Sequence, residues 1–227
     1  MSAPADSTAP FFHGLLRRRT SVRLTLRGWL AVLLAVGLAG TLALRRLPQF
    51  LMVEDSVPGG VLVVEGWVTD VVLARAMDEY RTGAYVVWCV TGEPLDKGGP
   101  LNDYADYATL TVAIYEKRGG PPGSLHAVQW ESVRRDRTYA SALALKAWLS
   151  ARGLPLDRVN VVTRGTHARR SRLLYEKAFG AGTRVGVIAV PESDFDTGRW
   201  WATSAGFRAV VDETIAYIYA RCFFRGR

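Results

Sequence analysis

From residue 59 onwards, short apolar runs alternate with longer segments in which apolar residues recur at helical spacing. The apolar runs are rich in β-branched residues, as buried strands are, and they lie at 61–64, 85–90, 126–130, 159–163 and 185–190. Helices are predicted at 70–81, 101–118, 137–151, 166–179 and 206–223. Such alternation forms right-handed βαβ units. The sequence therefore predicts an α/β fold, with a Rossmann-like parallel sheet of about five strands and helices on both faces.

Two expectations about the core follow from this pattern. The last predicted helix has apolar residues on one side, which we expect it to bury: Phe207, Val210, Val211, Ile215 and Ile218. Cys89 lies inside an apolar strand, where burial raises the pKa of a thiol. We therefore expect Cys89 to be a core residue that neither acts as a nucleophile nor pairs with Cys222.

An uncharged apolar run of 17 residues, 28–44, precedes the α/β pattern. At 1.5 Å per residue the run spans about 25 Å, near the lower limit for a helix that crosses a membrane. Five arginines precede it and two follow it, so the positive-inside rule predicts a cytoplasmic N-terminus and a domain on the far side. A cleaved signal peptide and a buried helix of a soluble protein are the alternatives that remain open.

These features predict four parts of the chain. They are a basic cytoplasmic segment (1–27), a transmembrane helix (28–44), a linker with two prolines (45–58) and the α/β domain (59–227). The run 28–44 makes the lipid bilayer the first expected partner.

Composition and charge exclude several classes of protein. Hydrophobic residues make up 49% and charged residues 22% of the chain, which is ordinary for a globular protein. The net charge is +8, but seven arginines against Asp6 give +6 to residues 1–50, and 22 basic against 20 acidic residues leave +2 for 51–227. The basicity belongs to the N-terminus, so no nucleic-acid partner is expected. Two cysteines and three histidines are too few for the common cysteine-rich or histidine-rich sites, so no metal is expected.

Several well-known motifs are absent from the sequence. The first strand is followed by a single glycine, Gly66, rather than by G-x-G-x-x-G. Neither a phosphate-binding G-x-x-x-x-G-K-[ST] loop nor a G-x-S-x-G nucleophile turn occurs. We therefore expect no bound cofactor.

Ligands of open parallel sheets bind at the carboxyl ends of the strands, and here polar residues follow four of the predicted strands. The densest group is TRGTHARRSR, residues 163–172. Thr166 is a plausible N-cap, and the positive end of the following helix, with Arg164, His167 and Arg170, is typical of an anion site. Solvated surface charge, with His167 only capping or packing, is the alternative reading of this segment.

The neighbouring predicted helix begins at Arg137, with Asp136 or Thr138 as its cap. We predict that the four basic side chains converge with two carboxylates on one anion-binding cleft: His167, Arg170, Arg164, Arg137, Glu131 and Glu93. Acid–base catalysis would fall to His167 with Glu131 or Glu93. The other expected ligand contacts are Thr138, Thr163, Thr91, Gly92 and Glu65.

Four segments together resemble the ElyC/SanA/YdcF family of bacterial domains. Its motif T-S-x-Y-H-M-x-R is matched at Thr163, His167 and Arg170. The segment E-x-S-x-x-T-x-E-N-A is echoed by Glu131, Ser132, Thr138, Tyr139 and Ala142, the S-G-G turn by Thr91-Gly92-Glu93, and A-x(6)-G by Ala76 and Gly83. The resemblance covers roughly 58–189. The chain departs from the family at Val72, where arginine is usual, and at Ala140-Ser141, which replace Glu-Asn.

The resemblance implies a Rossmann-like domain, often behind one membrane helix, in cell-envelope and lipid-carrier metabolism. It favours a single-pass protein of the bacterial inner membrane with an extracytoplasmic domain. The expected ligand is a phosphorylated or lipid-carrier-linked envelope precursor, that is, a phosphate-bearing small molecule or a lipid-linked glycan. Whether the domain is an enzyme stays open, and the alternatives are a non-catalytic binding or scaffold protein and a nucleotide- or S-adenosylmethionine-binding domain.

Overall fold

The computed structural model describes residues 10–11, 16–17, 24–67, 69–95, 103–131, 133 and 135–226. The chain divides into two compact units, Met1–Leu44 and Arg45–Arg227.

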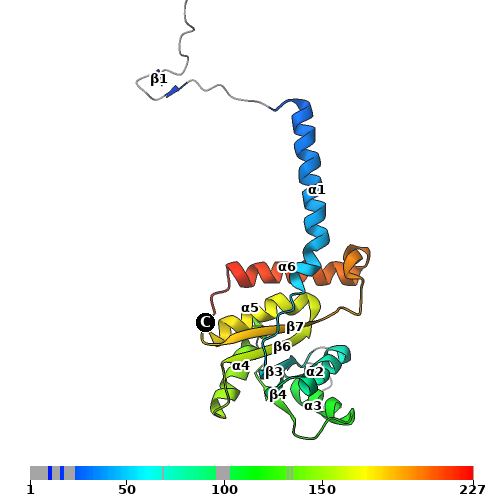
Figure 1. Ribbon diagram of the computed structural model, residues 1–227, viewed down its shortest axis with the longest axis vertical. Coiled ribbons are helices and arrows are strands. Elements are labelled where there is room, and N and C mark those ends of the chain that lie inside the picture. Colours follow the sequence, from blue (N-terminus) through cyan, green and yellow to red (C-terminus); the bar gives the residue numbers. More distant parts are fainter. Residues whose placement is uncertain are drawn as a thin grey trace, which may run out of the picture. The chain divides into compact units, whose positions relative to one another are not determined.

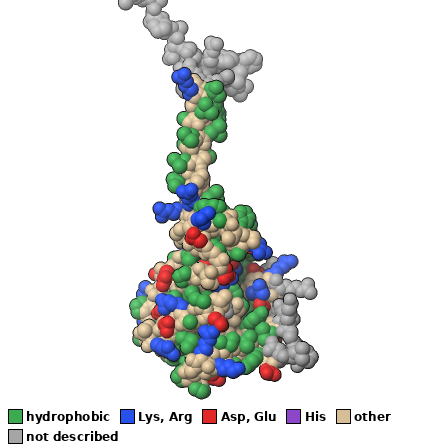
Figure 2. Space-filling model, turned by 90° about the vertical axis from the view of Figure 1, so that its right-hand side faces the viewer, with side chains coloured by type: hydrophobic (Ala, Val, Ile, Leu, Met, Phe, Trp, Pro, Cys, Tyr) green, Lys and Arg blue, Asp and Glu red, His purple; other side chains and the backbone are tan. Residues whose placement is uncertain are grey.

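The first unit contains a small strand pair and most of a long helix. Strands β1 (Pro10–Phe11) and β2 (Leu16–Arg17) pair antiparallel. Helix α1 (Leu26–Leu51) begins in this unit, and its apolar stretch is exposed and is long and apolar enough to cross a membrane. Figure 2 shows the hydrophobic side chains along this helix. The structure thus has one candidate membrane span among its described residues, and the helix extends into the predicted linker.

A five-stranded sheet lies at the centre of the second unit (Figure 1). Its strands are β3 (Gly60–Glu65), β4 (Tyr85–Gly92), β5 (Leu125–Gln129), β6 (Arg158–Arg164) and β7 (Arg184–Val190). They are parallel, in the order β5-β4-β3-β6-β7. This is the doubly wound Rossmann order, in which the strand order reverses between β3 and β6. The predicted fold class is confirmed.

Four helices cover the two faces of the sheet because side chains alternate along each strand. Val64 and Trp88 face α2 (Asp70–Thr82) and α3 (Tyr107–Lys117). Val63 and Cys89 face α4 (Arg137–Ala151) and α5 (Ala168–Phe179). Cys89 is fully buried and unpaired, as expected, and burial raises the pKa of its thiol to about 12.

Three helix starts differ from the prediction, and the last helix, which begins at Ser204 rather than at 206, differs least. Helix α3 begins at Tyr107 rather than at 101, since Asp106 caps it by accepting a hydrogen bond from the Thr109 amide at 2.7 Å; residues 101–102 lie outside the described residues. Helix α5 begins at Ala168, after the 3₁₀ turn η2 (Gly165–His167), and Thr166 does not cap it.

The C-terminal part of the chain packs over α5 and the last turns of α1. The 3₁₀ segment η3 (Thr197–Ala202) leads to α6 (Ser204–Cys222), and Thr203 caps this helix by accepting from the Gly206 amide at 3.1 Å. Figure 1 shows α6 beside α5. Val210 is buried against Leu51 of α1, together with Phe195 and Trp200.

The prediction that α6 buries its bulky apolar side is wrong for three of the five residues. Phe207, Ile215 and Ile218 are 51%, 62% and 49% exposed. The side of α6 that meets the domain carries small residues, Gly206 and Ala220, and they are buried. A Cβ on Gly206 would lie 2.4 Å from the carbonyl oxygen of Trp200. Only a side of α6 with small residues can approach the domain so closely, and the bulky apolar residues therefore lie on the outer side.

Candidate functional site

A cavity of about 450 Å³ lies at the carboxyl ends of β3 and β4. This volume is typical of small-molecule sites, and the position is the one at which Rossmann-like sheets bind ligands. Its wall includes eight of the eleven residues expected from the sequence, namely Glu65, Thr91, Gly92, Glu93, Arg137, Thr138, His167 and Arg170. Helix α6 closes one side with Glu213, Ala216, Tyr219 and Ala220.

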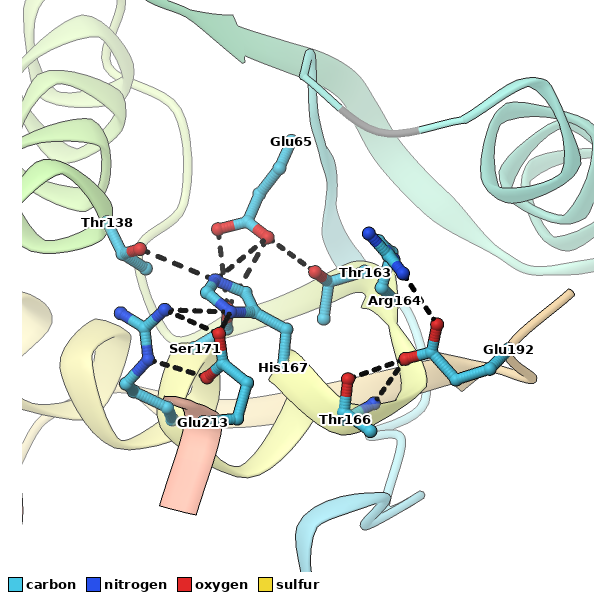
Figure 3. A network of polar contacts seen from close by, with 10 residues as sticks. Glu65, Thr138, Thr163, Arg164, Thr166, His167, Ser171, Glu192 and Glu213 are labelled. Carbon is cyan, nitrogen blue, oxygen red and sulfur yellow. Dashed lines mark hydrogen bonds and ion pairs between the residues drawn. The ribbon is translucent and has the colours of Figure 1, made fainter. Parts of the chain in front are cut away.

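His167 is held from both ring nitrogens (Figure 3). Its Nδ1 lies 2.8 Å from Glu213 Oε1, and its Nε2 lies 3.5 Å from Thr138 Oγ1 and 3.8 Å from Glu65 Oε2. The edge-on ring of Trp67, 5.0 Å from the imidazole between centroids, covers it further. His167 is therefore a buried side chain whose ring is held in one orientation.

Glu213 and Arg170 both contact Nδ1 of this histidine. Burial opposes ionisation of the Glu213 carboxyl, but the charges and hydrogen bonds of His167 and Arg170 outweigh it and lower its pKa to about 2. Arg170 Nη2, a pure donor, also lies 2.9 Å from His167 Nδ1, but it already donates to Glu213 Oε1 at 3.0 Å. An ionised carboxylate only accepts hydrogen bonds and makes the shorter contact, 2.8 Å, so we assign the proton to Nδ1 of His167. The lone pair then stays on Nε2, the nitrogen near Thr138 and Glu65, where it can accept a proton.

Arg170 completes this group as a partner of Glu213. Its Nε donates to Glu213 Oε2 at 2.8 Å, and its Nη2 donates to Oε1 at 3.0 Å, a bidentate pair. The Glu213 contacts raise the pKa of Arg170 against the opposing effect of burial. Arg170 is in the cavity wall, as expected, but its charge is already balanced by Glu213.

Glu65 is a buried carboxylate at the end of β3, with 1% of the residue exposed. Thr163 of β6 donates to its Oε2 at 2.5 Å, and Ser171 of α5 donates to its two oxygens at 3.3 and 3.4 Å. These hydroxyls satisfy the carboxylate in the interior. A proton accepted by His167 Nε2 would lie within ion-pair distance of Glu65.

The start of α4 places two exposed arginines in the cavity wall, Arg135 and Arg137, with the carboxylate of Asp136 between them in the chain. Arg137 donates to Glu93 Oε1 at 2.7 Å, yet its side chain is 63% exposed. Arg135 is exposed and forms no ion pair with any described residue. Asp136 adopts a left-handed backbone conformation, φ 58°, and makes no side-chain cap, so it leaves the first N–H groups of α4 without a carboxylate. Two arginines and a helix N-terminus together favour binding of an anion.

Gly92 in the cavity wall is required by close packing. A Cβ there would lie 2.1 Å from the backbone nitrogen of Ala108 at the start of α3. Gly66, the one glycine after β3, is similarly enclosed: its amide donates to the Thr91 carbonyl at 2.7 Å, and a Cβ would lie 2.8 Å from that oxygen. Both glycines allow two backbone segments to pack closely against each other, and we assign neither of them to a phosphate-binding loop.

Three of the expected site residues lie outside the cavity wall. Arg164 pairs with Glu192 at 2.8 Å instead of joining His167 and Arg170, so the expected convergence of four basic side chains is wrong. Thr163 is buried against Glu65, and Glu131 is exposed away from the wall. Ser132 lies outside the described residues.

Glu192 explains why the predicted anion site at the start of α5 is not open. Its Oε1 accepts from the Thr166 amide at 2.9 Å and from the Thr166 hydroxyl at 2.6 Å. Its Oε2 accepts from Arg164. The carboxylate thus takes the place of an external anion, and the exposed arginines of the cavity wall lie instead at the start of α4.

Sequence reasoning missed Glu213 and Glu192. Glu213 lies 46 residues after His167 and Glu192 lies 26 residues after Thr166, so no local spacing pairs them. The sequence does contain one indication that Glu213 faces the domain. On the helix it lies opposite the exposed apolar residues Phe207 and Ile215 and on the same side as Ala220, which is buried. Among the described residues, no cluster of three His, Cys, Asp or Glu side chains is arranged to hold a metal ion.

Comparison with protein-family models, with curated proteins and with solved structures gave no match. Function is therefore inferred from the cavity's side chains and their geometry. These provide an imidazole oriented by a carboxylate, a buried second carboxylate and a helix start with two exposed arginines. Together they can bind an anionic group and move a proton beside it.

Proposed function

We propose that this is a membrane-anchored cell-envelope protein whose cavity binds a phosphate-bearing precursor and processes it by acid–base chemistry. The observation that carries the proposal is the Glu213–His167 pair in the cavity wall, 2.8 Å apart, with Nε2 left to accept a proton. A carboxylate that orients a histidine in this way is a recurrent arrangement of general bases.

The anionic part of the ligand would bind at the start of α4. Arg137 and Arg135 are exposed there, and the first N–H groups of the helix point to the same end. Each charge-assisted hydrogen bond contributes about 1.5–3 kcal/mol, so these groups would supply part of the affinity and fix the position of the anion. Arg170, which Glu213 neutralises, would position the histidine rather than hold the anion.

In hydrolysis of a phosphate ester or pyrophosphate, His167 Nε2 would accept the proton of an attacking water. The water oxygen bonds to phosphorus as the bond from phosphorus to the leaving oxygen breaks. The imidazolium would be flanked by Glu213 and Glu65. These carboxylates replace Glu131 and Glu93, which the sequence suggested as partners of the histidine.

Membership of the ElyC/SanA/YdcF family is part of the proposal. The histidine and final arginine of the matched motif, His167 and Arg170, lie together in the cavity wall, and its first threonine, Thr163, supports Glu65 behind them. Helix α1, the one candidate membrane span among the described residues, agrees with the anchor that the resemblance implies. We propose the bacterial inner membrane as the location, with the N-terminus in the cytoplasm and the α/β domain outside.

The experiment uses the full-length protein in lipid vesicles with a polyprenyl pyrophosphate as the probe. Binding is measured by calorimetry with inorganic pyrophosphate, and turnover by release of inorganic phosphate. Binding together with release supports the proposal. Binding without release supports the non-catalytic scaffold alternative, and absence of both contradicts a phosphate-bearing ligand.

A further inference from the structure

The outward side of α6 is a continuous apolar stripe. Phe207, Val211, Ile215, Ile218 and Cys222 follow each other at spacings of 4, 4, 3 and 4 residues. At 3.6 residues per turn these positions fall within an arc of about 80°. Val211 is half-buried and the other four are exposed, so the stripe is a surface and not part of the core. Isolated exposed apolar residues are ordinary, but an ordered stripe marks an interaction surface.

Aromatic and basic side chains extend this surface. Phe223 is exposed directly after the helix, and Trp201 is exposed just before it. The guanidinium of Arg45 lies 5.9 Å from the centre of the Trp201 ring. Arg208 and Arg221 are exposed on α6 itself. An apolar face with tryptophan and flanking arginines is characteristic of helices that lie in a membrane–water interface.

The covalent link between α1 and the α/β domain favours a lipid surface as the partner of this stripe. Leu51 at the end of α1 is fully buried against Val210 of α6. Seven helical residues separate Leu51 from Leu44, the end of the apolar run, which amounts to about 10 Å of helix. The chain therefore holds the contact between Leu51 and α6 within about 10 Å of the end of the apolar run, and so close to the membrane that this run would cross. The short connection makes a lipid surface the occupant nearest to α6 along the chain, whereas a second copy of the chain would have to be recruited.

We propose that the outer face of α6 lies in the interfacial region of the bilayer that holds α1. The opposite side of the same helix contributes Glu213, Ala216 and Ala220 to the cavity wall. One helix diameter, about 10 Å, thus separates the lipid from the cavity. This surface does not depend on the proposed reaction, and it would bring the cavity within reach of a ligand carried by a membrane lipid.

Cys222 provides a native probe of this surface. It is exposed on the stripe, whereas Cys89 is fully buried with a raised thiol pKa, so a fluorescent maleimide added in detergent would label Cys222. The labelled full-length protein is then reconstituted into vesicles that contain lipids spin-labelled at acyl carbon 5 or 12. The control carries the label at Ala151→Cys in a Cys222→Ala background, an exposed position at the end of α4.

We expect at least twofold stronger quenching of the Cys222 label than of the control, with the carbon-5 lipid more effective than the carbon-12 lipid. Protection from aqueous iodide should accompany it. Equal iodide quenching at both positions would overturn the proposal. Iodide protection that comes without lipid quenching and disappears when the protein is diluted in lipid would show a second copy on this face, which also overturns it.

A matched pair of substitutions separates lipid contact from folding. Ile215→Glu with Ile218→Glu should reduce lipid quenching of the Cys222 label at least twofold, and Val71→Glu, at an exposed site on α2, should leave it unchanged. The melting temperature should stay within a few degrees in each variant because all three side chains are exposed. Unchanged lipid quenching in the double variant would contradict the proposal.

Discussion

Glu213 Oε1 lies 2.8 Å from His167 Nδ1, although the two residues belong to different helical segments and are 46 positions apart. The contact joins the C-terminal helix to the carboxyl edge of the sheet. It orients the imidazole ring, and it neutralises Arg170 through a bidentate pair. The site therefore depends on α6 as much as on the sheet that holds the rest of the cavity.

This contact predicts an acid-dependent loss of stability. The Glu213 pKa is about 2 in the folded protein and near 4.5 when unfolded, so its contribution is fully present above pH 4.5 and is lost as pH falls towards 2. A difference of this size corresponds to about 3 kcal/mol of unfolding free energy. Denaturant unfolding of the full-length protein in detergent, repeated across this pH range, measures it.

The control for this prediction is the neighbouring exposed carboxylate. Glu213→Gln should destabilise the protein at neutral pH and flatten the pH dependence between 4.5 and 2, since Arg170 loses its charged partner. Asp212→Asn should preserve both the stability and its pH profile. Identical profiles for the wild type and Glu213→Gln would show that the carboxylate does not carry the effect.

Arg137→Ala should weaken binding of inorganic pyrophosphate by about 10- to 100-fold, the equivalent of one charge-assisted hydrogen bond. The stability should change by less than about 1 kcal/mol, because the side chain is largely exposed. Calorimetric titration of the full-length variant measures the affinity. Arg81→Ala, at an exposed arginine on α2, is the matched control and should bind as the wild type does. Equal affinity in both variants would remove Arg137 from the anion site.

Thiol chemistry tests the core. In detergent at pH 8, a maleimide should label one thiol per native chain, that of Cys222, and two after denaturation. The reason is that Cys89 is enclosed by the sheet and has a pKa of about 12. Mass spectrometry of the labelled peptides identifies the site. Rapid native labelling of Cys89 would contradict its place in the core between β4 and α4.

Topology is tested with reporters fused after Arg227. The arginine asymmetry around 28–44 predicts that alkaline phosphatase, which folds outside the cytoplasm, is active there and that a cytoplasmic reporter is not. Reversed activities would place the α/β domain in the cytoplasm and would contradict the proposed envelope location.

The fold was predictable from local pattern because each strand and helix carries its own signal. The β-branched runs of β3 and β6 can be recognised without their neighbours, and the glycine after α5 marks the helix end. The direction in which α6 faces was not predictable. Periodicity shows that Phe207 and Ile215 share a side, but whether protein or lipid covers that side depends on the partner and not on the pattern.

The candidate site was predictable as far as backbone position determines it. Strand ends meet at one edge, so Glu65, Thr91 and His167 reach one cavity by topology alone. Pairing of long charged side chains is different because it depends on tertiary neighbours. Arg164 forms an ion pair with Glu192, which lies 28 residues further along the chain, and no local sequence pattern indicates this pair.

Phosphate release from a polyprenyl pyrophosphate tests the central claim most directly. Full-length wild type, His167→Gln and His126→Gln are compared in the same vesicles; His126 lies on β5, outside the cavity wall. We predict that His167→Gln lowers the rate at least 100-fold while inorganic pyrophosphate still binds, and that His126→Gln retains the wild-type rate. Equal rates for the two histidine variants would contradict the assignment of His167 as the acid–base group.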